Sequence, residues 1–266
     1  WESVPRPAGS ILLGAAFGFS FHVQPAFLLV LVGYLGFELW WRGDPARWGS
    51  AALVAVAALA TCVPWGVRNY RTLDAVFFVR SNFGLELRMG NHEGAEASID
   101  HPHFLREAPH PRTHPAEAVK VREWGEAAYM RDSGDEARAW IASHPGSFAR
   151  LTAERFAYFW LGPLDRPGIA VLFSLLTGLA LLGALEGFRR LTPPQFAALV
   201  IPLLTFPLVY YLVPWQHRYR FPVEWILFLL AGSAVVGVVS RAGGSARTRA
   251  PEVPARERPD LDSGSP

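Results

Sequence analysis

The stretch Pro64-Trp65-Gly66-Val67-Arg68-Asn69-Tyr70-Arg71 marks the point where an apolar segment gives way to basic and amide side chains. Trp and Tyr favour the boundary between a bilayer and water, because the ring is apolar and one edge can form a hydrogen bond. An arginine just beyond that boundary can bind a lipid phosphate as a planar, bidentate donor. The stretch therefore predicts the end of a membrane-spanning helix, with Arg68 and Asn69 just outside the hydrocarbon.

The composition of the chain also favours a membrane protein. Of the 266 residues, 51% are hydrophobic and 18% are charged, whereas soluble domains usually carry about 25% charged residues. The net charge of +2 is too small to argue for a nucleic-acid partner. The single cysteine, Cys62, excludes an intrachain disulfide and argues against a thiolate metal site. The chain opens at Trp1 without a signal-peptide pattern, and we expect it to be the C-terminal part of a longer protein.

Long apolar segments predict about six membrane spans, one of them partial, because a spanning helix needs about 20 mostly apolar residues. Residues 1–65 predict a helical hairpin that turns at residues 22–25, followed by one span. One long helix kinked at Pro25 is the alternative. An interfacial helix and three spans are expected in residues 151–240, and a disordered cytoplasmic tail in residues 241–266. The apolar segments themselves are residues 11–21, 26–41, 48–65, 168–185, 196–213 and 223–239.

Residues 66–150 are polar and predict an extracytoplasmic insert with mixed α/β structure. Residues 75–80 are rich in β-branched and aromatic side chains, which favours a strand. Residues 115–131 have helical periodicity, and residues 135–143 predict a shorter helix. The expected fold class is therefore mainly α, a polytopic α-helical membrane protein with a small α/β insert.

The distribution of Lys and Arg predicts how the chain lies in the membrane. Short cytoplasmic loops are enriched in these residues, and alternation through the spans places three basic segments on one side: Arg42 with Arg47, Arg189 with Arg190, and Arg241 with Arg247 and Arg249. The insert and the loop 214–221 then lie on the outer side. That loop departs from the charge rule, since it holds His217, Arg218 and Arg220. We expect a multi-pass protein of the plasma or inner membrane.

Two basic clusters at the outer ends of spans form the candidate phosphate site. They are Arg68 with Arg71, and His217-Arg218-Tyr219-Arg220. One interpretation is a pocket for a lipid-linked phosphate. The other is contact of long side chains with lipid headgroups, together with ion pairs to Glu86 or Glu224. The residues alone leave both interpretations open.

Other polar residues give weaker indications. Four histidines lie in one proline-rich stretch, but their spacing is not that of a helix face or a zinc finger, so a solvated loop explains them better than a metal site. They are His101, His103, His110 and His114. A loop that approaches a ligand closely would suit Asn82, Gly84, Gly90 and Asn91, although turn formation explains them equally well. No carboxylate stands out as a catalytic acid or base.

Several short motifs occur in a fixed order along residues 14–232. They are Pro64-Trp65-x-x-Arg68-Asn69-Tyr70, Val79-Arg80-Ser81-Asn82-Phe83-Gly84-Leu85-Glu86-Leu87, Gly90-Asn91, Gly125-Glu126-x-x-Tyr129, Trp140-Ile141-x-x-His144-Pro145, Arg155 with Phe159-Trp160, and His217-Arg218-Tyr219-Arg220-Phe221-Pro222. With its hydropathy, this ordered set resembles the bacterial GT-C glycosyltransferases. These integral-membrane enzymes are related to protein O-mannosyltransferases and to the aminoarabinose transferase of lipid A.

The resemblance implies transfer of a sugar from a polyprenyl-phosphate donor to a lipid, glycan or protein acceptor on the outer side of the membrane. It implies an inverting displacement, with a carboxylate of the first outside loop as the base. That loop would precede Trp1, so the catalytic base is unknown here. No cofactor is identified, and the sequence does not support a divalent metal. The family often has an arginine before the proline near its second span, where this chain has Gln24-Pro25.

The resemblance also implies roles for individual side chains. Arg68, Arg218 and Arg220 would bind the donor phosphate and stabilise the negative charge that develops on it. The other expected substrate-binding residues are Asn69, Asn82, Asn91, His217 and Tyr219.

Two other functions compete with transfer. A transporter or flippase for lipid-linked sugars predicts ionisable residues deep within the spans, and the interiors of residues 48–63 and 168–185 have none. The third hypothesis is a non-catalytic membrane scaffold whose insert binds a partner protein.

Overall fold

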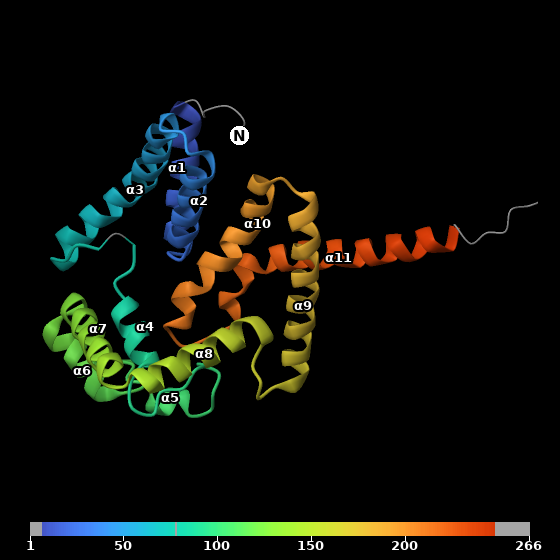
Figure 1. Cartoon of the computed structure of the whole chain (residues 1–266). Helices are drawn as coiled ribbons and strands as arrows, with labels where there is room; N and C mark the ends of the chain where they lie inside the picture. Colours follow the sequence, from blue (N-terminus) through green and yellow to red (C-terminus); the bar gives the residue numbers. More distant parts are fainter. Residues whose placement is uncertain (1–6, 78, 248–266) are drawn as a thin grey trace, which may run out of the picture.

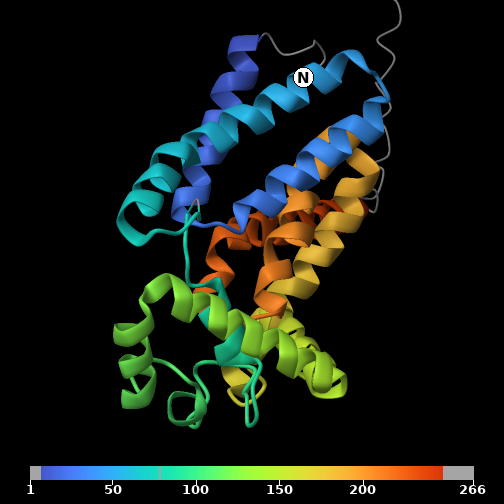
Figure 2. The same cartoon turned by 90° about the vertical axis from the view of Figure 1, so that its left-hand side faces the viewer.

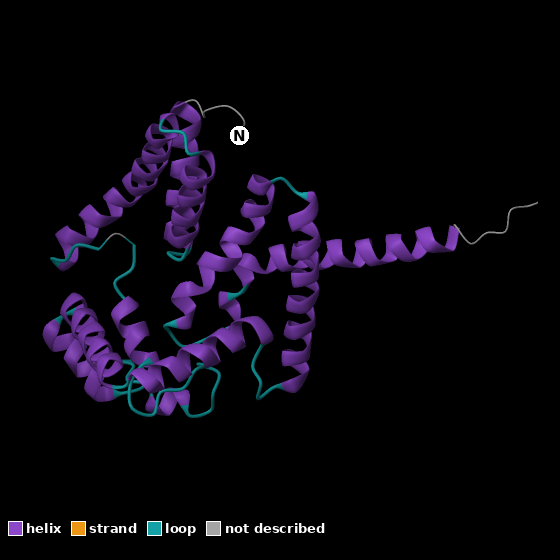
Figure 3. Ribbon diagram, in the orientation of Figure 1, coloured by secondary structure: helices purple, strands orange, loops and turns teal. Residues whose placement is uncertain are grey.

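The computed structural model describes residues 7–77 and 79–247, and the regular elements in this part of the chain are helices (Figures 1 and 3). The expectation of a mainly-α fold is confirmed. The α-helices are α1 (Pro7–Val23), α2 (Phe27–Arg42), α3 (Ala46–Leu73), α4 (Phe83–Gly90), α5 (Phe104–Glu107), α6 (Pro115–Trp124), α7 (Glu126–Ser143), α8 (Pro145–Leu161), α9 (Pro167–Arg190), α10 (Pro193–Thr205) and α11 (Phe221–Arg247). Two 3-10 helices, η1 (Phe206–Tyr211) and η2 (His217–Tyr219), lie between α10 and α11.

Four of these segments are long and apolar enough to cross a membrane: Arg47–Leu73 in α3, Pro167–Arg190 in α9, Pro193–Tyr211 across α10 and η1, and Phe221–Ser240 in α11. The first predicted span corresponds to α1, which is apolar but shorter. A turn at residues 24–26 separates α1 from α2. The turns after α2 and α9 lie at one end of the molecule, and the insert lies at the other (Figures 1 and 2).

The prediction of a strand at residues 75–80 is wrong, and the prediction of an α/β insert is therefore wrong as well. The described residues of this segment form no strand, and residue 78 lies outside the described part. Between α3 and α8 the insert instead contains α4 to α7. A segment rich in β-branched residues forms a strand when a neighbouring strand accepts its hydrogen bonds. Within the described residues the insert offers one isolated bridge, between Ser98 and Trp215.

Glycines decide where the helices of the insert begin and how closely they pack. The predicted helix 115–131 is divided at Gly125, whose φ of 78° favours glycine. α7 then continues without a break through the second predicted helix, at residues 135–143. α4 crosses α7 at Gly84, where an added methyl group would collide with the carbonyl of Met130.

The C-terminal boundary also differs from the expectation. α11 continues to Arg247, beyond the expected start of the disordered tail at residue 241. The rest of that predicted tail, residues 248–266, lies outside the described residues, as do residues 1–6.

Small residues bring α1 against α3. Ser10, Gly14 and Gly18 recur every four residues on one face of α1 and are buried. A methyl group on Gly14 would overlap the carbonyl of Val54, and one on Gly18 would overlap Thr61. Helices in lipid associate largely through close packing, and small residues at this spacing permit it. The spacing is visible in the sequence, but its partner helix becomes apparent only in the structure.

Replacing Gly14 by leucine should separate α1 from α3 and destabilise the protein by about 1–3 kcal/mol, the usual cost of overpacking. Thermal unfolding of the detergent-solubilised protein measures this loss. Gly9→Leu is the matched control, because a side chain at Gly9, also in α1, meets no other atom within 4 Å. Equal melting temperatures for the two variants would show that the contact of α1 with α3 does not support the fold.

A buried carboxylate organises the insert. Glu117 of α6 accepts hydrogen bonds from Arg88 at 2.6 Å, Tyr129 at 2.7 Å and Lys120 at 3.0 Å. Burial alone would raise the pKa of Glu117, but these hydrogen bonds outweigh burial and lower the pKa to about 2. Because the pKa in the folded state lies below the ordinary value of 4.5, ionised Glu117 stabilises the folded insert at neutral pH.

This stabilisation should be fully present above pH 4.5 and should be lost as the pH falls from 4.5 to about 2. The Glu117→Gln variant should therefore be less stable than the wild type at pH 7, and the difference should shrink across that acid range. Thermal unfolding at a series of pH values measures the difference. Glu123→Gln, at an exposed position of the same helix, should show no such convergence.

Candidate functional site

The insert is joined to the loop between η1 and α11. The backbone N–H of Trp215 donates to the carbonyl of Ala97 at 2.7 Å, and its carbonyl accepts from the N–H of Ile99 at 3.1 Å. The Trp215 side chain is 1% exposed. This pairing holds the loop 214–221 against the insert, where the insert meets the ends of the long apolar helices (Figure 2).

Arg155 of α8 fixes the same junction from inside. Its guanidinium is fully buried and donates to the carbonyl of Gly90, to the carbonyl of Leu212 at 3.0 Å and to Oδ1 of Asn91 at 3.4 Å. Burial lowers the pKa of Arg155 to about 10, against the opposing effect of Glu154. Arg155 therefore joins the end of α4 to the end of η1.

Asn91, an expected substrate-binding residue, is part of this buried junction. Its side-chain amide donates to the carbonyls of Leu87 at 2.7 Å and Leu212 at 2.9 Å. The residue is 1% exposed. Its amide thus supports the backbone, and a substrate cannot reach it without a rearrangement.

Arg220 is also buried, with 0% of its surface exposed. The guanidinium donates to the carbonyls of Phe159 and Trp160, both at 3.2 Å, and to the Thr177 hydroxyl at 3.3 Å. Glu224 lies 3.5 Å from its Nε, and the Phe173 ring centroid lies 4.3 Å from Cζ. Burial lowers the pKa of Arg220 to about 10, and Glu224 opposes the shift. These contacts join α8, α9 and the start of α11.

Arg218 has the opposite character, because its side chain is exposed. Its Cζ lies 5.8 Å from the ring centroid of Tyr219. Tyr219 stacks on Tyr210, with ring centroids 4.3 Å apart, and the Tyr210 hydroxyl accepts a hydrogen bond from Gln24. The aromatic stack thus connects the exposed arginine to the turn between α1 and α2.

A carboxylate faces this group, and from the sequence it is expected only as an ion-pair partner. Glu86 of α4 is half-buried and accepts from the Asn82 amide at 3.2 Å. Burial raises the pKa of Glu86, while the charges of Arg218 and Arg80 oppose the rise. Arg80 also donates to the Val23 carbonyl at 3.3 Å. The sequence feature that could have pointed to Glu86 as a site residue is the motif 79–87, which contains both Arg80 and Glu86.

We name this group the junction cluster and define it by its members: Gln24, Arg80, Asn82, Glu86, Tyr210, Arg218 and Tyr219. It draws together residues from four separate parts of the chain: the turn after α1, the start of α4, η1 and η2. Burial and the nearby Glu86 raise the pKa of Tyr219, and Arg218 opposes the rise. The cluster holds two arginines around one carboxylate, which gives it a surplus of positive charge.

Arg68 and Asn69 form a separate pair at the end of α3. The Asn69 amide is buried and donates to the Phe77 carbonyl at 3.0 Å. Arg68 is exposed, donates to Oδ1 of Asn69 at 3.0 Å and lies 4.9 Å from the Trp65 ring centroid. Asn69 therefore fixes the segment that follows α3 and positions Arg68 at the end of the span.

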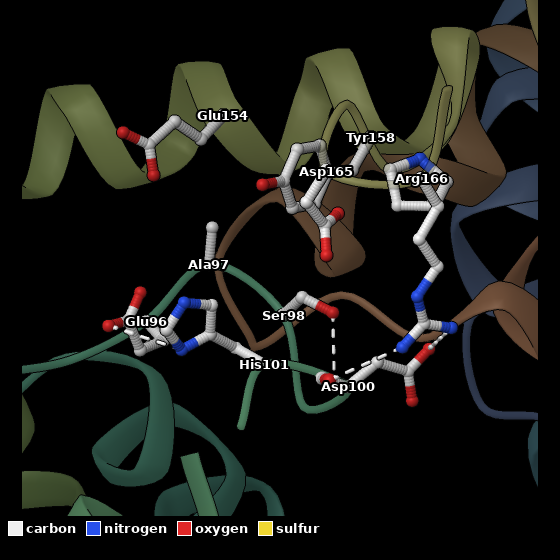
Figure 4. A pocket seen from close by; sticks show the side chains of 10 residues that line it. Glu96, Ala97, Ser98, Asp100, His101, Glu154, Tyr158, Asp165 and Arg166 are labelled. Carbon is white, nitrogen blue, oxygen red and sulfur yellow. Dashed lines mark hydrogen bonds and ion pairs between the residues drawn. The ribbon is translucent and has the colours of Figure 1, made fainter. Parts of the chain in front are cut away.

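His217 lies near a third group of charges. Its Nδ1 is 3.8 Å from Oδ2 of Asp100, and Nη1 of Arg166 is 3.9 Å from the same oxygen. Figure 4 shows Arg166 pointing toward Asp100 beside a cavity that is also lined by Ser98 and Tyr158. The cavity measures about 30 Å³, which is enough for about one water molecule and too small for a sugar.

The four histidines of the proline-rich stretch make local contacts. The rings of His101 and His103 are 5.4 Å apart, and Nε2 of His114 lies 3.0 Å from the Arg106 carbonyl. In the described part of the chain, no three His, Cys, Asp or Glu side chains are arranged so that they could hold a metal ion.

The two arginines of the loop after η1 should respond differently to truncation. Arg220→Ala leaves buried acceptors and the Glu224 carboxylate without their partner, and should cost about 3–5 kcal/mol. Arg218→Ala removes an exposed side chain and should change stability by about 0.5 kcal/mol or less. Thermal unfolding in detergent distinguishes the two. Similar losses in both variants would contradict the structural role of Arg220.

Comparison of the chain with protein-family models, with curated proteins and with solved structures finds no match.

Proposed function

We propose that this chain acts in a membrane glycosyltransferase that uses a polyprenyl-phosphate sugar donor. The observation that carries the proposal is the junction cluster, in which an exposed arginine and a second arginine converge beside stacked tyrosines where the insert meets the apolar helices. The ordered motifs that resemble GT-C transferases support it. The apolar helices are suited to a multi-pass protein of the plasma or inner membrane.

The chemistry of the junction cluster suits a lipid-linked phosphate. When the sugar is transferred, the bridging oxygen stays with the polyprenyl phosphate, and its negative charge increases. Arg218 can meet that charge as a bidentate donor, because its guanidinium is exposed and is held beside the Tyr219 ring and near the Glu86 carboxylate. A preorganised positive group at this point stabilises the transition state more than the ground state. Arg68, exposed at the end of α3, offers a second donor at lipid-headgroup depth.

Glu86 has a positioning role in this proposal. Its carboxylate attracts Arg218 and Arg80, which keeps both guanidinium groups at the junction in the absence of substrate. Arg220 has a structural role in this proposal. It is buried, and its contacts hold α8, α9 and α11 together next to the loop that carries Arg218 and Tyr219. The base that accepts the proton of the acceptor is not assigned to a residue of this chain.

The decisive variant is Arg218→Ala. It should weaken binding of undecaprenyl phosphate to the full chain in lipid nanodiscs by about 10- to 100-fold, the loss expected when charge-assisted hydrogen bonds of about 1.5–3 kcal/mol are removed. It should abolish sugar transfer from the lipid donor in membranes that contain the intact protein, while the amount of membrane-inserted protein stays unchanged.

Two controls accompany this experiment. Arg122→Ala removes an exposed arginine from the end of α6, outside both basic clusters, and should leave binding of the lipid phosphate within about twofold of the wild type. Undecaprenol, which lacks the phosphate, should bind the wild type and Arg218→Ala equally. Wild-type affinity and wild-type transfer in the Arg218→Ala variant would refute the assignment of this cluster to the donor phosphate.

A further inference from the structure

A groove between α9 and α11 lies on a different part of the molecule from the junction cluster. The two helices touch at Gly183, where an added methyl group would overlap the backbone carbonyl of Leu230. Beyond this contact they diverge, and α11 extends away from α9 (Figure 1). The space between them measures about 510 Å³, within the range of about 300–1,000 Å³ that is typical of ligand pockets.

The walls of the groove are apolar, and its end is basic. Leucines of α9 and valines of α11 form the walls: Leu179, Leu182, Leu185, Val235, Val238 and Val239. These six side chains are exposed. Glu186, Arg189 and Arg190 of the last turns of α9 line the groove as well. The apolar walls suit a hydrocarbon chain, and the basic end suits a negatively charged headgroup.

The three charged side chains at the end of the groove, Glu186, Arg189 and Arg190, leave a net positive charge. Glu186 lies between the helices with 15% of its side chain exposed and pairs with Arg190 at 2.5 Å. It also occupies the space beside Gly237, where an added methyl group would come within 2.5 Å of its carboxylate. Arg189 is exposed and supplies the surplus positive charge at the end of the groove.

We propose that this groove binds one anionic glycerophospholipid. An acyl chain lies between the leucines of α9 and the valines of α11, and the headgroup phosphate meets the guanidinium of Arg189. Basic sites between membrane helices favour anionic lipids, because the charge attraction adds to burial of the chain. The spans place this end on the side opposite the insert, so the lipid belongs to the other leaflet from the donor phosphate. The site is independent of the proposed sugar transfer.

The charge of Arg189 also indicates which kind of molecule fits the groove. A hydrophobic helix packed along α9 and α11 would cover the leucines and valines but would offer Arg189 no negatively charged partner. A phospholipid satisfies both parts of the groove at once. A zwitterionic lipid offers the same chain but carries no net negative charge.

Native mass spectrometry of the full chain tests the proposal, with phosphatidylglycerol and phosphatidylcholine as competing probes. The wild type should retain one phosphatidylglycerol in preference to phosphatidylcholine by at least fivefold. Arg189→Ala should remove that preference. Val238→Phe, which fills the groove from an exposed position, should reduce retention of both lipids. Arg122→Ala, the same change of charge at an exposed position of the insert, should keep the wild-type preference.

Equal retention of the two lipids by the wild type would overturn the proposal, as would an undiminished preference in Arg189→Ala. A dimer mass in place of a lipid adduct, lost in Val238→Phe, would also overturn it, because the occupant would then be a helix of a second copy. Thermal unfolding of each variant in the same detergent confirms that it is folded. None of these outcomes depends on Arg218 or on the donor phosphate.

Discussion

The guanidinium of Arg155 occupies the point where the insert meets the apolar helices, and it is buried with carbonyl and amide oxygens as its hydrogen-bond acceptors. Burying a charge is costly unless its hydrogens find partners. Here the partners of the two terminal nitrogens come from the end of α4 and from the end of η1, so these donors are engaged only when the insert is docked. Docking in turn presents Asn91, Trp215 and the basic loop in their observed positions.

The arginines at this end of the molecule divide into two kinds. Arg155 and Arg220 are buried and use their donors within the protein, whereas Arg68 and Arg218 are exposed and contact aromatic rings. A guanidinium whose donors are already engaged would have to break hydrogen bonds to accept a ligand. An exposed guanidinium beside a ring keeps donors that face solvent, even where it also makes a local hydrogen bond, as Arg68 does to Asn69. This difference is why the proposed phosphate site rests on Arg218 and Arg68, with Arg220 in a supporting role.

Close contacts at glycine recur at three of the helix pairs in the described part of the chain. Gly14 and Gly18 allow α1 to approach α3, Gly84 allows α4 to approach α7, and Gly183 allows α9 to approach α11. Helices that touch at one point and cross at an angle must diverge on either side of it. In the pair α9 and α11 the divergence leaves an apolar groove, so the same packing that joins two spans also creates a place for a lipid.

The sequence by itself determined the helical class, the apolar segments and the position of the polar insert, because these depend on composition and on the length of apolar runs. It did not determine the secondary structure of residues 75–80, since a strand depends on a partner that a local pattern cannot reveal. The nearness of Glu86 to Arg218, and the burial of Arg220 beside exposed Arg218, were decided only by the tertiary structure. Both result from contacts between residues far apart in the chain. The sequence around Arg218 and Arg220 does not indicate which of the two will be buried.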